Sequence, residues 1–394
     1  MADASESADQ SLEDESVGAA TAASVEEAEQ SAGAQDVHAS VGSGAPLTKP
    51  AADSEVPGLR ALLPILVLLA AHLPMALMHY RDAWSLEHYQ FFPFALGSFG
   101  WLIWTRRDAS RDNWSVPVLA LFVLDLLLLF TAVVKLSPWL AVAALVCGLT
   151  GISLAVRERS YTYSMFALSF LPLLTLKIPL NYDQLLINWL QLKTTALASA
   201  IGHRIGLEHY SEANILAVPG KRFLVAEACS GVNSLFTIMF IAAFVVGVKR
   251  RSAIHGLLLI AAGFVVAALM NTLRVLSVIV AWDVAKVDIA EGWIHDVLGY
   301  FVLILAAGFL MSADAFLDWV TDRIPDVKRP GAMSIYRNPL IRFWNRTLAT
   351  ATTHADAGSR AGAPMPGRFG LALGTLAVLA AAGQVLVIVQ GNLR

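Results

Sequence analysis

Long apolar runs separated by short polar segments dominate the chain from residue 59 onward. Most of these runs approach the roughly 17–25 residues that a helix needs to cross a bilayer. The second run is short and broken by Gly and Pro, which suggests a tilted or interfacial helix. The pattern predicts an all-α fold: a polytopic transmembrane helical bundle of about eight or nine spans. The expected spans are 59–78, 90–105, 115–134, 138–156, 161–177, 232–248, 254–282, 294–316 and 369–389.

The long segment 178–231 departs from this pattern. Residues 183–207 place apolar side chains among polar ones at helical spacing, which predicts a helix that lies in the interface or dips into the bundle. Two short apolar stretches then flank Pro219-Gly220, which is typical of a β-hairpin. The sequence therefore predicts an interfacial helix and a short hairpin, both on the periplasmic side, directly before residues 226–231 (AEACSG).

Composition supports a membrane protein. The chain is 56% hydrophobic and 15% charged, whereas soluble domains carry about 25% charged residues. Lys and Arg gather after the second, fourth, sixth and eighth expected spans, and such residues accumulate in cytoplasmic loops. We therefore expect a multi-pass protein of the cell inner membrane with a cytoplasmic N-terminus. The lipid bilayer is then an expected partner, and nucleic acid is not.

The remaining segments lie outside this bundle. Residues 1–56 contain twelve acidic residues and a single Lys49, so they are expected to be a disordered acidic N-terminal tail. The main transmembrane domain is expected over 57–317. A basic cytoplasmic segment over 318–368 and a C-terminal transmembrane helix over 369–394 complete the predicted organisation.

The chain has two cysteines, too few for a disulfide framework. Cys147 lies in the middle of an apolar run, where a cysteine behaves as a small hydrophobe. The sequence contains neither a CxxC pair nor HExxH. We accordingly expect no metal and no cofactor.

Cys229, Arg274 and His295 are predicted to share the periplasmic membrane face, because each lies at that end of an expected span. Ionisable groups at membrane depth usually face the bundle interior and have a partner. A cysteine at a helix N-terminus is favoured as thiolate. A histidine can take and return its proton, and an arginine suits a developing oxyanion. The three groups have the parts needed for amide attack and acyl transfer.

Four stretches surround these residues: Asn214–Gly220 (NILAVPG), Ala226–Leu235 (AEACSGVNSL), Asn271–Val275 (NTLRV) and His295–Tyr300 (HDVLGY). By these four stretches, residues 177–300 resemble the exosortase/archaeosortase family of multi-pass cysteine transpeptidases. The resemblance assigns the family's catalytic residues to Cys229, Arg274 and His295, and the histidine is typical of the bacterial branch.

The resemblance implies a specific reaction. The substrate would be a secreted protein whose C-terminal sorting signal consists of a short motif, a transmembrane helix and a basic cluster. Cys229 would cleave near the motif, form a thioester, and pass the acyl group to an amine or to water. Such systems accompany exopolysaccharide production in biofilm-forming Gram-negative bacteria.

Neighbouring polar residues are candidates for orienting these groups, and Gly231 and Gly299 are expected to permit close helix approach. Two alternatives stay open. One is an intramembrane serine protease that uses Ser230, although Ala228 stands where a Gly-x-Ser-Gly motif would begin. The other is a non-enzymatic transporter or scaffold of polysaccharide export. The supporting candidates are Glu227, Ser230, Asn233, Asn271 and Asp296.

Overall fold

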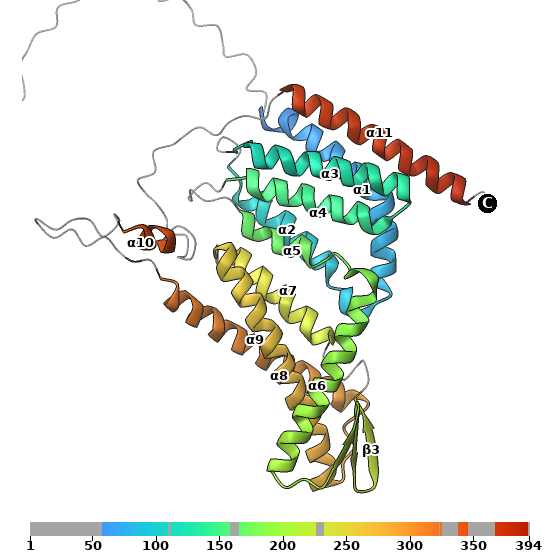
Figure 1. Ribbon diagram of the computed structural model, residues 1–394, viewed down its shortest axis with the longest axis vertical. Coiled ribbons are helices and arrows are strands. Elements are labelled where there is room, and N and C mark those ends of the chain that lie inside the picture. Colours follow the sequence, from blue (N-terminus) through green and yellow to red (C-terminus); the bar gives the residue numbers. More distant parts are fainter. Residues whose placement is uncertain are drawn as a thin grey trace, which may run out of the picture. The chain divides into compact units, whose positions relative to one another are not determined.

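The computed structural model describes residues 57–108, 112–157, 165–225, 232–322, 324, 338–345 and 367–392 (Figure 1). The predicted acidic tail over 1–56 lies outside these residues. So does most of the predicted basic segment over 318–368.

The first four expected spans are present as helices. Prolines occupy the first turns of the second, third and fourth, where a missing N–H costs nothing. Apolar side chains of the first, third and fourth helices share one buried cluster. The four helices are α1 Pro57–Trp84, α2 Phe92–Arg106, α3 Val116–Lys135 and α4 Pro138–Ala155.

The expected span over 161–177 is wrong in its described part. The chain forms only a 3-10 helix, η3 (Phe166–Ser169), and one further helical turn, α5 (Phe170–Leu173). Pro172 lacks the N–H that would continue the helix, and Thr175 turns back to bond the Pro172 carbonyl through its hydroxyl at 2.8 Å. The hydropathy of the sequence alone does not reveal such an interruption of the helix.

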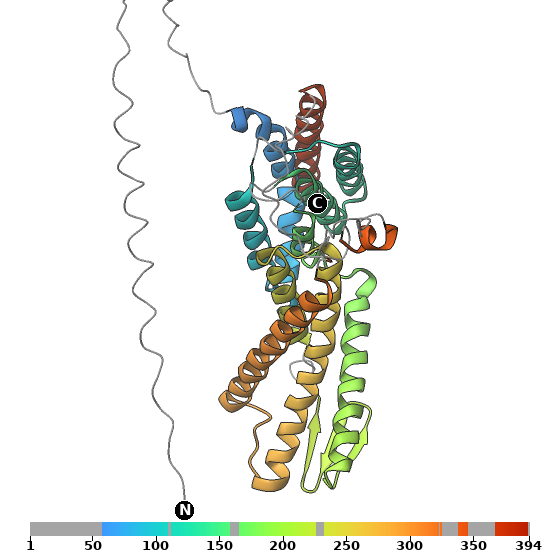
Figure 2. The same cartoon turned by 90° about the vertical axis from the view of Figure 1, so that its left-hand side faces the viewer.

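The predicted amphipathic helix is present as α6 (Tyr182–Arg204), which follows a short 3-10 turn, η4 (Pro179–Asn181). Figure 2 shows α6 beside the long helix α8 (Ala253–Ala285), with the small sheet at one end of the pair. The side of α6 that is buried includes Thr194 and Thr195 as well as apolar residues.

The predicted hairpin is confirmed, within an antiparallel sheet of three strands in the order β1-β2-β3. Val218 pairs with Lys221 across the Pro219-Gly220 turn, where Gly220 has φ +86°. A glycine adopts this left-handed conformation without steric cost. The first strand was not predicted. The strands are β1 Tyr210–Glu212, β2 Ile215–Val218 and β3 Lys221–Leu224.

The C-terminal part contains α7 (Val232–Val248), α9 (Trp293–Val320), the short α10 (Pro339–Phe343) and α11 (Gly367–Asn392). Helices α7, α8 and α9 pack together. Within the described residues, five helices are long and apolar enough to cross a membrane, and α7 and α11 have shorter apolar stretches. The five are α1, α3, α4, α8 and α9.

Helix α11 is tied to α1 by a buried amide. Gln384 donates from Nε2 to the Ala71 carbonyl at 2.8 Å, and its Oε1 accepts from the Met75 N–H at 3.2 Å. Met75 follows Ala71 by four positions, so the carbonyl and N–H that Gln384 bonds are an i, i+4 backbone pair of α1, next to Pro74. The C-terminal helix is thus a specific part of the bundle.

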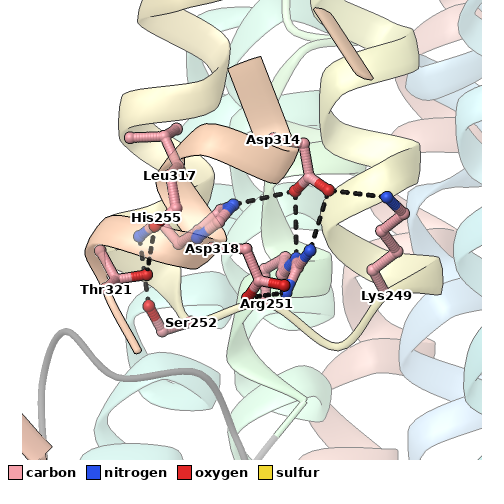
Figure 3. Close-up of polar contacts among 8 residues, drawn as sticks. All are labelled: Lys249, Arg251, Ser252, His255, Asp314, Leu317, Asp318 and Thr321. Carbon is pink, nitrogen blue, oxygen red and sulfur yellow. Dashed lines mark hydrogen bonds and ion pairs between the residues drawn. The ribbon is translucent and has the colours of Figure 1, made fainter. Parts of the chain in front are cut away.

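The α7–α8 turn is held against α9 by a buried carboxylate (Figure 3). Asp314 on α9 is fully buried, and its oxygens accept from Lys249 Nζ at 2.7 Å, Arg251 Nη2 at 2.9 Å and His255 Nε2 at 2.9 Å. Arg251 also pairs with Asp318. This group, the Asp314 cluster, fixes how α8 and α9 pair at one end.

We expect Asp314→Asn to lower the free energy of unfolding by about 3 kcal/mol, because Arg251 and Lys249 lose their shared buried counter-charge. Denaturant titration of the purified protein in detergent measures the change. The matched control is Asp283→Asn, which removes a more exposed pair with Lys286 at 3.9 Å and should cost under about 1 kcal/mol. Equal effects of the two variants would show that the Asp314 cluster does not hold the helices together.

Candidate active site

Arg274 and His295 lie together, where α8 meets the first turn of α9. Arg274 donates from Nη2 to the His295 carbonyl oxygen at 3.5 Å. The guanidinium lies over Gly299, where a Cβ atom would approach Nη2 to 2.9 Å and Cζ to 3.1 Å. Gly299 therefore leaves the space that the arginine occupies.

His295 is the third residue of α9 and only 7% exposed. Its ring Nδ1 lies 3.1 Å from the carbonyl oxygen of Ile289. A carbonyl can only accept, so Nδ1 carries the proton of the neutral ring and Nε2 carries the lone pair. Gly292, with φ +79°, caps α9 in the turn between Ile289 and His295. The backbone thus selects the tautomer in which Nε2 can act as a base.

Asp296, a candidate for orienting the histidine, is exposed, and the bond from Nδ1 goes to the backbone. As an acidic residue in the first turn of α9, Asp296 lies where negative charge stabilises a helix.

Asn271 lies one turn before Arg274 on α8 and is 3% exposed. Its Nδ2 donates to the Thr194 hydroxyl on α6 at 3.4 Å. Its Oδ1 is buried and has no hydrogen-bond partner in the part of the chain that the structure describes, and the same holds for Nε of Arg274. Helix α8 therefore presents an unused acceptor and an unused donor one turn apart, between α6 and α9.

Asn233 lies in the first turn of α7 and bonds elsewhere. Its Nδ2 donates to Glu87 Oε2 at 2.7 Å. Glu87 begins a 3-10 helix, η1 (Glu87–Tyr89), in which His88 packs on Phe236 of α7 with ring centroids 5.3 Å apart. Burial raises the pKa of Tyr89 to about 12, and its hydroxyl accepts from the Ile178 N–H at 2.9 Å. The contacts of Asn233 with Glu87 and of Phe236 with His88 thus hold the start of α7 against η1.

Cys229, Glu227 and Ser230 belong to residues 226–231, which lie outside the described residues. The chain on either side of them is described. Val225 belongs to a hydrophobic cluster with Val275, Val278 and Ile279 of α8. Leu235 belongs to another cluster, with Ala267 of α8. The described residues Val225 and Leu235, which flank this segment in the sequence, thus belong to clusters that include α8 residues on either side of Asn271 and Arg274.

Several residues around these groups escaped the sequence-based search. They are Thr194, which bonds Asn271, Glu87, which bonds Asn233, and Ile289, whose carbonyl meets His295. Each acts through a tertiary contact or a backbone atom. No motif or spacing in one sequence signals such a role.

The sequence model of the transmembrane exosortase family matches residues 83–312. The match covers more than half of the chain, so the protein belongs to the transmembrane exosortase family. No curated protein and no solved structure matches the chain. Together with the five long apolar helices, family membership makes this a helical membrane protein. Membership also indicates a transpeptidase or protease.

Proposed function

We propose that this protein is an exosortase-type cysteine transpeptidase that removes the C-terminal sorting signal of secreted proteins. In this proposal the thiolate of Cys229 attacks the carbonyl carbon of the scissile peptide bond. Nε2 of His295 takes the thiol proton and delivers it to the leaving amine as the C–N bond breaks. Arg274 stabilises the oxyanion. The acyl group then leaves the thioester for an amine acceptor or water.

The pairing of Arg274 with His295 is the observation that carries this proposal. A half-buried cation and an imidazole with its basic nitrogen defined lie side by side. Val225 and Leu235, which flank segment 226–231 in the sequence, belong to clusters that include α8 residues on either side of that part of the helix. This arrangement supports a role for Cys229 as the nucleophile acted on by both groups.

We further propose the predicted topology of eight or nine spans, with a cytoplasmic N-terminus and the active site near the periplasmic face of the inner membrane. Contacts between loop ends support it. Arg106, at the end of α2, donates to the Gly247 carbonyl at the end of α7 at 2.6 Å. The Asp108 N–H donates to the Arg157 carbonyl after α4 at 3.0 Å. The Asp314 cluster adds the end of α9, so the basic loops expected in the cytoplasm come together.

Because the described part of 161–177 forms only short helical segments, the proposed topology requires another crossing before the periplasmic hairpin. We propose that η3, α5 and α6 make it together. Met165, Leu168 and Leu171 pack in one cluster with Leu102 and Val156, near the basic ends of α2 and α4, whereas α6 leads to the hairpin.

We propose the domain organisation and partners that the sequence predicts. The proposed catalytic domain is 57–317, preceded by the acidic tail and followed by the basic segment and the C-terminal helix. The proposed substrates are secreted proteins with a motif, a transmembrane helix and a basic cluster, and the proposed setting is exopolysaccharide production.

We expect Cys229→Ala to reduce processing of a tagged sorting-signal protein at least about 10³-fold, because no other group replaces the nucleophile. The ratio of processed to membrane-retained substrate on an immunoblot measures this. Cys147→Ala, at the other cysteine of the chain, is the matched control and should process normally. Full processing by Cys229→Ala together with loss in Ser230→Ala would instead favour a serine mechanism.

We expect Gly299→Val to lower processing by roughly 10²-fold, because the new side chain displaces the Arg274 guanidinium from the His295 carbonyl. Gly308→Val on the same helix is the control, since a Cβ there meets nothing within 4 Å. The same immunoblot provides the measurement, with melting temperatures to confirm folding. Normal processing by a folded Gly299→Val protein would exclude a requirement for the observed Arg274 position.

A further inference from the structure

Among the described residues, three buried polar side-chain atoms of α8 have no hydrogen-bond partner. One belongs to His255 in the first turn, and the other two lie one turn apart further along the helix: Oδ1 of Asn271 and Nε of Arg274. A buried polar group without a partner costs free energy, so each such group in a folded protein requires an explanation. The bond from Nδ2 to Thr194 at 3.4 Å orients the Asn271 amide and leaves Oδ1 on its other side. The hydrogen bond from Asn271 to α6 therefore does not provide a partner for this oxygen.

The two atoms are chemically complementary to a peptide. Oδ1 accepts a hydrogen bond and Nε donates one. They are attached to residues three positions apart on one helix, a rise of about 4.5 Å along its axis. In an extended chain the N–H and C=O of one residue point to the same side, as in the paired bonds of an antiparallel ladder.

We propose that Asn271 and Nε of Arg274 form a subsite that binds the main chain of an extended peptide substrate beside the scissile bond. This inference rests on the proposed function and assigns Asn271 a substrate-binding role. Oδ1 of Asn271 accepts the N–H of one substrate residue, and Nε of Arg274 donates to a substrate carbonyl. The Nη2 side of the same guanidinium contacts His295, so the subsite adjoins the reacting groups.

The position of the subsite supports this role. Asn271 lies between the α8 residues that cluster with the hairpin (Val275, Val278 and Ile279) and those that cluster with α7, among them Ala267. Segment 226–231, which contains Cys229, joins these two regions along the chain. A peptide held by Asn271 and Arg274 is therefore held on the part of α8 between the two clusters that contain the residues flanking this segment, Val225 and Leu235. Main-chain recognition also places no demand on the substrate's side chains at that residue.

The test uses a synthetic peptide that covers the sorting signal of one secreted protein from the same genome. A backbone ester replaces the amide, and so removes the N–H, at each of the four residues before the cleaved bond in turn. The full-length enzyme in detergent cleaves each peptide, and kcat/KM is measured. At one position the ester should lower kcat/KM by about tenfold in the unaltered enzyme, the effect of one lost hydrogen bond.

Asn271→Ala should cleave the all-amide peptide about tenfold more slowly and should show no further loss with the ester at that position. Asn271→Ser, which also lacks the carbonyl oxygen, should behave in the same way if the alanine variant folds poorly. The control is Thr272→Val, because the buried Thr272 hydroxyl donates within α8, to the Ala268 carbonyl at 3.0 Å, and has no other hydrogen bond among the described residues. It should retain the ester sensitivity of the unaltered enzyme.

Ester effects of the same size in the unaltered enzyme and the Asn271 variants at every position would overturn the subsite. So would normal cleavage by both Asn271 variants. Cys229→Ala separates this outcome from failure of the proposed function. If cleavage of the all-amide peptide depends on Cys229, only the subsite is wrong, whereas cleavage independent of Cys229 refutes the cysteine mechanism itself.

Discussion

A single buried carboxylate fixes the geometry on which the candidate site depends. Asp314 accepts hydrogen bonds from three side chains of the α7–α8 turn and the first turn of α8. A buried charge is tolerated only with such compensation, so the turn and α9 have one favourable arrangement. Further along the same helix pair, Arg274 meets the first turn of α9. The Asp314 cluster therefore defines the pairing that brings Arg274 to His295.

The site combines the α8–α9 pair with individual contacts that position its side chains. Gly299 gives the Arg274 guanidinium its space, and the Ile289 carbonyl sets the tautomer of His295. Thr194 of α6 orients Asn271. Each contact contributes little on its own, but together the contacts hold these polar side chains at defined positions. An acyl-transfer enzyme in a membrane needs this order, because its groups must be oriented before the substrate arrives.

Hydrophobic runs predicted α1 to α4 and α7 to α9 within a few residues, because each run is long and its ends are marked by charge or proline. They failed at 161–177, where Pro172 stops an apolar segment from forming a long helix. The alternation of the expected spans across the membrane predicted that Arg274 and His295 lie at the same end of the α8–α9 pair, where they are in contact. The roles of Thr194 and Ile289 could not be predicted, because Thr194 acts through the packing of α6 and Ile289 acts through its backbone carbonyl.

The central claim is that Cys229 carries the acyl group during processing. Intact-protein mass spectrometry of the enzyme, quenched in acid shortly after mixing with a sorting-signal peptide, tests it most directly. The account predicts a covalent adduct with the mass of the peptide segment before the cleaved bond, mapped to Cys229 and released by hydroxylamine, as a thioester is. Rapid peptide cleavage under these conditions without any adduct on Cys229, or with a hydroxylamine-resistant adduct on Ser230, would contradict it.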